Sequence, residues 1–356
     1  MKATMPGNAH CASGAEGGGR RNGFILIAAL WLLVALGAVG LDAALRSRSR
    51  RLAAANLIDE TRARAAATAG VEYARSRLSA AMLDRADELR AEALSAARTS
   101  RQRTQAERRS VTNLFRQSDP LEDPWRAPDE LIREEMAFGD ARYSLRVRDT
   151  GAALNLNNAS EEVLRQFFAQ GMAVDYAHAD RLAQAILDWR DADEIPRLGG
   201  AERDQYLDAE APMLPPNRDF AELDELRYVM GMTPELYEAA KPYLTLIGSG
   251  NVNVNAAPGP VLLALPDMTP SAVTELMRLR EIGGVPRNAN QLRRMIPMFD
   301  TNRGREREFD AMTTYTTNEV EILAEGRVEG SPIRVQARVV VARSTAGAVV
   351  VWRRFD

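Results

Sequence analysis

The sequence predicts an α+β protein in which an N-terminal membrane helix and an antiparallel sheet are combined with an inserted all-α domain. Three observations predict it. An uncharged apolar segment lies near the N-terminus, a long stretch poor in glycine and proline follows, and period-two alternation occurs at 141–149 and again near the C-terminus. Between the two strand regions the pattern is helical, so the sheet must combine segments that are distant in sequence.

The first element is the apolar segment 24–45. From Phe24 to Leu41 no residue is charged, and eleven of the eighteen are Leu, Ile, Val or Phe. Each contributes about −0.3 to −0.6 kcal/mol to insertion into a bilayer. At about 1.5 Å per residue the segment just crosses a hydrocarbon core of about 30 Å, which predicts a transmembrane helix. The alternative is a cleaved secretory signal, whose apolar core usually covers only about 7–15 residues.

The flanking charges and the leader favour opposite orientations. Arg20 and Arg21 precede the segment, but four arginines follow it, so charge alone favours a cytoplasmic C-terminal side. The basic, glycine-rich leader 1–23 ends at Gly23, and the apolar run begins with Phe24. This boundary resembles a type IV prepilin leader. The resemblance implies that prepilin peptidase cleaves between these two residues on the cytoplasmic side and that the new N-terminus is methylated.

Ala28 departs from the usual pattern of pilins and pseudopilins. Most of them carry a glutamate as the fifth residue after the cleavage site, where it is thought to pair with the N-terminus of a neighbouring subunit, and Ala28 stands there. The pairing would offset the cost of a charge in lipid. A subunit without this glutamate fits an end position in a filament better than a repeating one.

Composition excludes several classes of site. The chain has 356 residues, 46% of them apolar and 27% charged, which suits about two globular domains. Its single cysteine, Cys11, lies in the leader, and His178 is the one histidine after the leader. A disulfide, a histidine-based zinc site and a catalytic triad are therefore not expected in the mature chain. No phosphate-binding glycine motif or nucleophile with a base is present, so we expect no enzyme.

Charge is distributed unevenly along the chain. Fifteen arginines and nine acids lie between residues 42 and 109, whereas fifteen acids and six arginines lie between 180 and 240. The basic region is rich in Ala, Arg, Glu and Leu and predicts one long helix from Leu41 to about Arg109, broken at most once. Within region 46–140 this helix is followed by a polar segment whose Pro-rich end, 119–128, predicts a surface loop.

Strands are predicted on either side of the insertion. In region 141–157, apolar Tyr143, Leu145 and Val147 alternate with polar residues, which predicts the first strand. Near the C-terminus the same pattern returns at 320–328, 333–343 and 348–355, separated by turn sequences. We therefore expect an antiparallel meander that shares a sheet with the first strand.

The insertion is helical in two parts. Region 158–250 is an acidic α-domain whose first helix Asn158 or Ser160 could cap. Region 251–356 begins with a second helical segment before the meander. Their openings, NLNNA and NVNAA, look like a loose internal repeat.

An acidic turn in the insertion is a candidate cation site. Asp188, Asp191, Asp193 and Glu194 are followed by two glycines and Glu202. Clustered carboxylates suit calcium, which takes about 6–8 oxygen ligands in flexible geometry. Our hypothesis assigns side-chain ligands to Asp191, Asp193 and Glu202, with the Ile195 carbonyl and Asp188 nearby. The spacing does not match an EF-hand, and the alternative is a solvated acidic face.

Taken together, these motifs resemble one family. The leader ending in glycine, the alanine in place of glutamate, and the closing strands accompany three phrases: ILDWRDAD with GGAE, ELRYVMGMTPELYEAAKPYLT, and VNVNAAPGPVLLALP. The combination resembles the K-type minor pseudopilin of the type II secretion system. The polar segment from about 84 to 128 has no counterpart in that pattern.

The resemblance has several implications. It implies a pilin-like fold with an inserted helix-hairpin-helix/SAM-like domain, calcium in that domain, and no catalysis. It also implies a single-pass protein of the inner membrane with its C-terminal domain in the periplasm. Expected partners are the I-, J- and H-type minor pseudopilins, the major pseudopilin and the prepilin peptidase, with the chain at the tip of a filament.

Two alternatives remain open. The phrases NLNNASEEVL and VNVNAAPGPVLLALP also resemble helix-hairpin-helix modules of membrane-anchored competence proteins that bind DNA. Such modules contact phosphate through a Gly-x-Gly turn with basic neighbours, whereas the turn after Leu265 is Pro-Asp-Met-Thr-Pro and Gly231 stands alone among acids. No nucleic-acid partner is therefore expected. The second alternative is a minor pilin of a type IV pilus.

Overall fold

The computed structural model describes residues 19–297, 299 and 305–356, so most of the leader and Cys11 lie outside the described residues. The chain divides into two compact units, 1–59 and 60–356. The described part of the first unit is the beginning of helix α1, Gly19–Ser95. It contains an 18-residue window with a mean hydropathy of 2.2 and no buried residue, long and apolar enough to cross a membrane.

The second unit contains its own cores. Among the described residues whose side chains are placed, none before Ala63 is buried. Two clusters of buried apolar side chains follow, one between α1 and the sheet and one inside the insertion. Removing the residues before Glu60 uncovers neither cluster, so region 60–356 carries the interactions it needs to fold.

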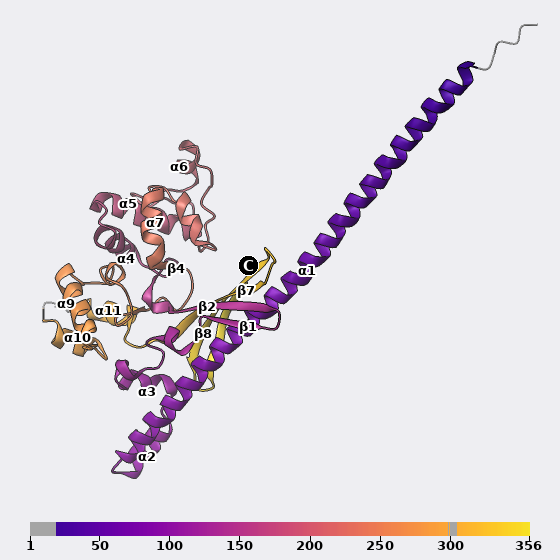
Figure 1. Ribbon diagram of the computed structural model, residues 1–356. Coiled ribbons are helices and arrows are strands. Elements are labelled where there is room, and N and C mark those ends of the chain that lie inside the picture. Colours follow the sequence, from indigo (N-terminus) through magenta and orange to yellow (C-terminus); the bar gives the residue numbers. More distant parts are fainter. Residues whose placement is uncertain (1–18, 298, 300–304) are drawn as a thin grey trace, which may run out of the picture. The chain divides into compact units, whose positions relative to one another are not determined.

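The sheet has five antiparallel strands in the order β1-β2-β7-β8-β9 (Figure 1). Their bounds are Glu135–Phe138, Ala141–Asp149, Glu319–Val328, Arg334–Ser344 and Gly347–Phe355. The predicted meander and its pairing with the first strand are confirmed, because β2 lies beside β7 with Leu145 opposite Ala324. β1 was not predicted. The first strand ends at Asp149, whose carboxylate accepts from the N–H of Gly151 at 2.8 Å and starts a 3₁₀ turn, η3, Thr150–Ala152.

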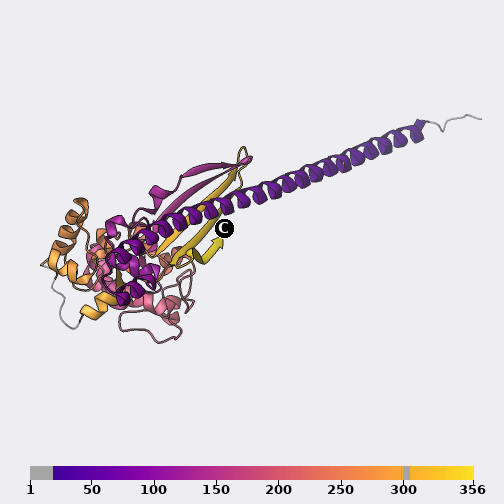
Figure 2. The same cartoon turned by 90° about the horizontal axis from the view of Figure 1, so that it is seen from below.

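Helix α1 packs on one face of this sheet, as both views show (Figure 2). Small and apolar side chains three or four residues apart form its buried face, which is the spacing of one helical stripe. They are Ala63, Ala66, Ala67, Val71, Ala74, Leu78 and Met82. The approach is closest at Gly326 of β7, where an added Cβ would lie 1.9 Å from the carbonyl oxygen of Ala63. Alanines on the helix and a glycine on the strand therefore allow the two backbones to meet.

The polar segment after α1 folds onto the same core. The long helix breaks after Ser95, and α2 (Ser100–Glu107), α3 (Val111–Gln117), η1 (Pro120–Glu122) and η2 (Pro128–Leu131) follow. The prediction of a surface loop at 119–128 was wrong. Trp125 is fully buried beside Phe115, and its Nε1 donates to the Leu78 carbonyl at 2.9 Å. A few apolar residues in this segment are buried although most of its residues are charged or polar. The average composition of the segment therefore did not predict its packing.

The insertion is one helical domain with one continuous core from Leu154 to Phe309. That core crosses residue 250, so the acidic domain and the second helical segment pack together. Its helical elements are α4 (Glu161–Gln166), η4 (Phe167–Gly171), α5 (Tyr176–Arg190), α6 (Arg203–Asp208), η5 (Leu223–Tyr228), α7 (Pro234–Ala240), η6 (Lys241–Tyr243), α8 (Gly259–Leu262), α9 (Pro270–Glu281), α10 (Ala289–Met295) and α11 (Glu306–Met312). Ser160, and not Asn158, caps α4.

An internal repeat organises the insertion. Each half begins with a two-residue strand in a parallel pair: β3 (Leu154–Asn155) with β4 (Leu244–Thr245), and β5 (Val252–Asn253) with β6 (Thr313–Thr314). In the first half Arg190 donates to the carbonyls of Leu156 and Ala159, and in the second Arg280 donates to that of Ala257. Burial lowers the pKa of both guanidinium groups. The predicted repeat is confirmed, with an arginine closing the Asn-rich turn of each half.

Asp149 joins the sheet to the insertion. Its Oδ2 accepts from Asn253 Nδ2 at 2.6 Å and from Thr317 Oγ1 at 2.8 Å, and the residue is 7% exposed. Burial raises the pKa of this carboxyl, while the hydrogen bonds to Asn253, Thr317 and Gly151 act against the rise. One buried side chain thus ties the end of β2, the start of β5 and the approach to β7.

Candidate metal centre

The acidic turn is held at both ends by buried aromatic packing. Before it, Trp189 in the last turn of α5 is fully buried, and its ring stacks on Phe220 with centroids 6.0 Å apart. After it, Tyr206 of α6 is 1% exposed and its ring lies 5.7 Å from that of Trp189. Residues 191–202 therefore connect two helices whose positions are fixed by one aromatic cluster.

Three carboxylates meet in this turn. One oxygen each of Asp191, Asp193 and Glu202 lies within 4.8 Å of the others. These are the three side chains that the sequence hypothesis assigned as ligands. Glu202 comes from the opposite end of the turn, beside the first residue of α6, so the folded loop is what brings it to the aspartates.

The carboxylate of Glu202 has no hydrogen-bond partner. The residue is 2% exposed, and both of its oxygens are buried without a partner, as is Oδ1 of Asp191. Burial, followed by the charges of Asp188, Asp191, Glu194 and Asp193, raises the pKa of Glu202 to about 7. Buried oxygens of this kind normally bind a proton, a donor or a cation.

A guanidinium group occupies one side of the cluster. Arg197 Nη1 lies 2.5 Å from Oδ1 of Asp188 and also contacts Asp191. The backbone N–H of Arg197 donates to Oδ2 of Asp188 at 3.1 Å. Asp188 is fully buried, and burial raises the pKa of its carboxyl although Arg197 lowers it. The sequence interpretation missed Arg197; the signal available was a lone basic residue within an acidic run.

Asp188 and Ile195 hold different positions from the three grouped residues. Asp188 Oδ2 approaches Gly200 so closely that an added Cβ there would lie 1.9 Å away, which explains a glycine at that place. The N–H of Ile195 donates to Oδ1 of Asp193 at 2.9 Å, and its side chain is 76% exposed. Asp188 thus orders the turn through Arg197, while the Ile195 carbonyl stays a predicted ligand.

The arrangement fits a hard divalent cation. Its donors are all carboxylate oxygens, three of those oxygens have no hydrogen-bond partner, and the turn is long enough to adjust to a flexible coordination sphere. Asp191, Asp193 and Glu202 are the residues that would hold the ion. A bound cation would also offset the repulsion between these carboxylates, which adds to the effect of burial on the pKa of Glu202.

The remaining predicted site residues lie elsewhere. Gly23 and Phe24 fall near the beginning of α1, and the side chain of Ala28 is exposed on the same helix. His178, which was not predicted to be a site residue, is half-buried on α5, with its Nε2 2.7 Å from the carbonyl oxygen of Gly231. That single backbone contact gives His178 a local structural role.

Comparison with known proteins matches the middle of the chain. Residues 144–249 match the family described as type II secretion system (T2SS), protein K. Type II secretion system protein K of Pectobacterium carotovorum is 33% identical over 109 residues, covering 29% of this chain and 33% of that protein. The protein of the same name from Dickeya chrysanthemi is 38% identical over 108 residues, covering 28% and 29% respectively. The chain therefore spans about a third of the length of these curated relatives.

A solved structure extends the similarity of fold to most of the chain. A chain of the GspK–GspI–GspJ complex from the enterotoxigenic Escherichia coli type 2 secretion system superposes with a TM-score of 0.52. The match has 16% identity and covers 87% of this chain and 99% of that one. It supports the predicted α+β, pilin-like fold with a helical insertion. Residues 144–249 are thus similar to type II secretion system protein K, within a chain whose fold resembles that of the solved structure.

Proposed function

We propose that the chain is a minor pseudopilin at the tip of the periplasmic pseudopilus of a type II secretion system, where it initiates or caps the filament. The observation that carries the proposal is the family match at 144–249, which covers the end of the first strand and the acidic half of the insertion. The five-stranded sheet packed on α1, and the apolar window of α1, support the same role.

The anchor and its processing follow from the prepilin-like leader. Segment 24–45 would cross the inner membrane once, with residues 60–356 in the periplasm. Prepilin peptidase would cleave between Gly23 and Phe24. Because Ala28 provides no carboxylate for a neighbouring subunit, the chain would occupy the end of the filament, and its bulky insertion would prevent another subunit from stacking above it.

The partners would be the I- and J-type minor pseudopilins first, and the H-type and major pseudopilins below them. The support is the structural neighbour, a complex of GspK with GspI and GspJ. The role is assembly and not catalysis, in keeping with a family named as a component of a secretion system. A filament growing from below such a cap could push or gate folded proteins through the outer-membrane channel.

We also propose that Asp191, Asp193 and Glu202 bind calcium. The support is the convergence of their oxygens and the missing hydrogen-bond partners of Glu202. The ion would stabilise the turn between α5 and α6. It would have a structural role, because Trp189 and Tyr206 tie this turn to the core of the insertion.

DNA binding has less support than assembly. In the turn after Leu265, Asp267 has a φ of 60° and pairs with Arg305 at 3.7 Å. A carboxylate at this place would repel a phosphate backbone, and Gly231 near the other turn binds His178 through its carbonyl. Retention of region 60–356 on duplex DNA that weakens steeply with salt would favour the competing function.

The direct test is co-purification of region 60–356 with the soluble domains of the cognate I- and J-type minor pseudopilins, in calcium and in chelator. We expect a stable ternary complex that calcium strengthens. A complex that forms equally well in chelator would show that assembly does not depend on calcium. Failure to associate in either buffer would contradict the assembly role.

A further inference from the structure

Strand β9 is a free edge of the sheet. It pairs with β8 alone, at the end of the strand order. Asp356 and Gln336 exchange both backbone hydrogen bonds, at 2.9 and 3.0 Å. In an antiparallel pair such residues alternate with residues whose backbone groups point away, and these are Arg353 and Phe355. Their N–H and C=O groups face the open side of β9.

The same strand exposes a continuous apolar run. Val349, Val350, Val351 and Trp352 are 42%, 39%, 56% and 37% exposed. A strand with one buried face shows alternating burial, but β9 is exposed at every position from Val349 to Arg354. Four exposed apolar residues on a free edge are a site of unwanted association unless another chain covers them.

The opposite edge, β1, is protected in the way free edges usually are. It has only four residues, and Phe138 is its one large apolar side chain that is exposed, at 45%. Glu135 on this strand pairs with Arg327 at 2.6 Å and with Arg142 at 3.7 Å. Short length and charged pairs discourage strand addition there. The two edges of the sheet therefore differ in length and in exposed side chains, and β9 is the edge suited to pair with an added strand.

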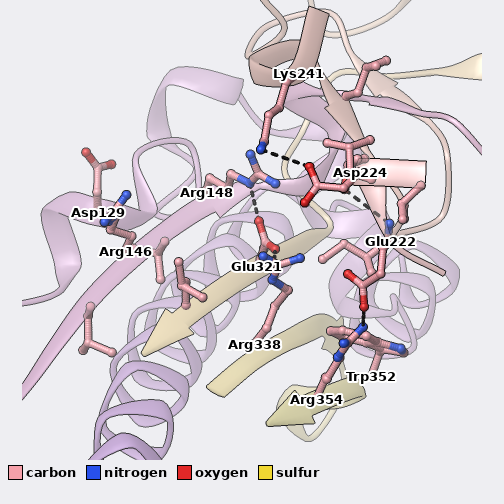
Figure 3. Close-up of a pocket in the computed structure, with 18 of the residues that line it drawn as sticks. Asp129, Arg146, Arg148, Glu222, Asp224, Lys241, Glu321, Arg338, Trp352 and Arg354 are labelled. Atoms are coloured by element: carbon pink, nitrogen blue, oxygen red, sulfur yellow. Dashed lines mark hydrogen bonds and ion pairs between the residues drawn. The ribbon is translucent and has the colours of Figure 1, made fainter. Parts of the chain in front are cut away.

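A groove continues from β9 across the outer face of the sheet. Its volume is about 760 Å³, and Trp352 and Arg354 line it together with Glu321, Arg338 and the segment 221–224 of the insertion. Figure 3 shows two ion pairs among the residues that line this groove, Arg354 with Glu222 and Arg148 with Glu321. Side chains on one face of a strand added to β9 would enter the groove beside Trp352.

The charges on β9 indicate what the added strand carries. Arg353 is exposed and forms no ion pair within the described residues, whereas its neighbour Arg354 is occupied by Glu222 and Asp356. The added strand should therefore be apolar opposite Val349–Trp352 and acidic opposite Arg353. Opposite charges directly across a strand pair stabilise it, and main-chain hydrogen bonds supply the rest.

A second copy of this chain does not meet these requirements. If two β9 strands paired antiparallel so that the apolar run was covered, Val350 would face Val351 and Arg353 would face Ala348. No acidic residue would then oppose the unpaired arginine. The complementary charge must come from a different chain.

We propose that β9 is a docking edge to which a partner minor pseudopilin adds an extended strand, apolar along its length with an acidic residue opposite Arg353. This inference rests on the proposed function, because the partner class comes from it, and it adds the strand and side chains through which the partner binds. The added strand extends the five-stranded sheet by one and buries Trp352.

The test measures binding of region 60–356 to the soluble domains of the cognate I- and J-type minor pseudopilins. Val351→Glu and Arg353→Glu are expected to weaken association about tenfold, because they place like charge against the acidic, apolar strand. Arg353→Lys should retain most of it. Phe138→Glu on β1 is the matched control, with the same kind of change at the other free edge, and should have no effect. Equal melting temperatures would show that the variants fold.

Two readouts report β9 directly. Trp125 and Trp189 are fully buried, so the acrylamide-accessible tryptophan fluorescence of region 60–356 reports Trp352, and it should decrease in the complex. Exchange of the Arg353 and Phe355 amides should slow. A complex that forms with neither change, or that Phe138→Glu weakens instead, would overturn the inference and leave the proposed function standing.

Two further outcomes would contradict the inference. Dimers of the wild-type region alone that Val351→Glu abolishes would show that β9 pairs with itself, which contradicts a heterologous strand. Absence of any complex with either partner would contradict both the docking edge and the proposed function.

Discussion

Arg343 and Asp123, 220 residues apart in the sequence, form an ion pair in which each side chain is 1% exposed. Nη2 of Arg343 lies 2.9 Å from both carboxylate oxygens and donates to the Thr317 carbonyl at 2.6 Å. Its guanidinium stacks over Phe115, 3.9 Å from the ring centroid. Strand β8 thereby holds the polar segment that follows α1, and the pair gives that segment a structural role.

Removing one partner of this pair should destabilise region 60–356. Asp123→Ala leaves the Arg343 guanidinium buried without a counter-charge, and we expect a loss of about 3–5 kcal/mol in the free energy of unfolding. Urea denaturation followed by circular dichroism measures it. Asp87→Ala, which breaks the exposed pair with Arg90, is the control and should cost at most about 1 kcal/mol. Equal losses of unfolding free energy in the two variants would mean that the buried pair stabilises the fold no more than the exposed pair does.

Gly326→Ala should separate α1 from the sheet. An added Cβ would lie 1.9 Å from the Ala63 carbonyl oxygen and 2.7 Å from the Ala67 nitrogen, and both are backbone atoms that cannot rotate away. Overpacking typically costs about 1–3 kcal/mol, and we expect the upper end here. Gly259→Ala, whose Cβ would have its nearest neighbour at 3.7 Å, is the matched control. A normal melting temperature for Gly326→Ala would refute the close approach.

The stability of region 60–356 in chelator should fall as the pH rises from about 5 to 8. The pKa of Glu202 is about 7 in the folded chain and 4.5 when unperturbed, so the folded state holds the proton more tightly. That stabilisation is fully present below the unperturbed pKa and is lost as the pH passes the folded one, by on the order of 2 kcal/mol. Glu202→Gln should abolish the slope. Thermal melts across this pH range measure the change, and a melting temperature that rises with pH would contradict the prediction.

Calcium should raise the melting temperature of the same region at pH 8. An ion that binds only the folded state adds about 2.7 kcal/mol at a hundredfold excess over its dissociation constant. Glu202→Gln should remove most of the increase. Glu194→Gln, which lies outside the group of three converging carboxylates, should keep it. If chelator leaves the melting temperature of the wild type unchanged, the cluster is a solvated acidic face instead.

Leader cleavage should depend on Gly23. Gly23→Val in the full-length chain should block the shift to a smaller species when prepilin peptidase is co-expressed, because the resemblance places the cut after this glycine. Ala28→Glu should leave cleavage unchanged and alter only the position of the chain in the filament. Processing of the Gly23→Val chain at the wild-type rate would favour a secretory signal or an uncleaved anchor.

Local sequence patterns determined the elements that depend on local physics. Uncharged apolar length marked the anchor, alternation marked β2, β7, β8 and β9 almost to the residue, and the repeated Asn-rich turns marked the two halves of the insertion. The three carboxylates of the candidate metal centre could be identified because they lie within twelve residues of one another.

Tertiary structure alone decided the long-range pairings. Nothing local to Trp125 or Asp123 indicated burial, since their positions depend on Phe115, Leu78 and Arg343 in other elements. The close approach at Gly326 requires the crossing of α1, and the exposed run on β9 appears only once the strand order leaves it at an edge. The sequence alone determines patterns that repeat over a few residues, whereas burial and pairing across hundreds of residues exist only in the folded chain.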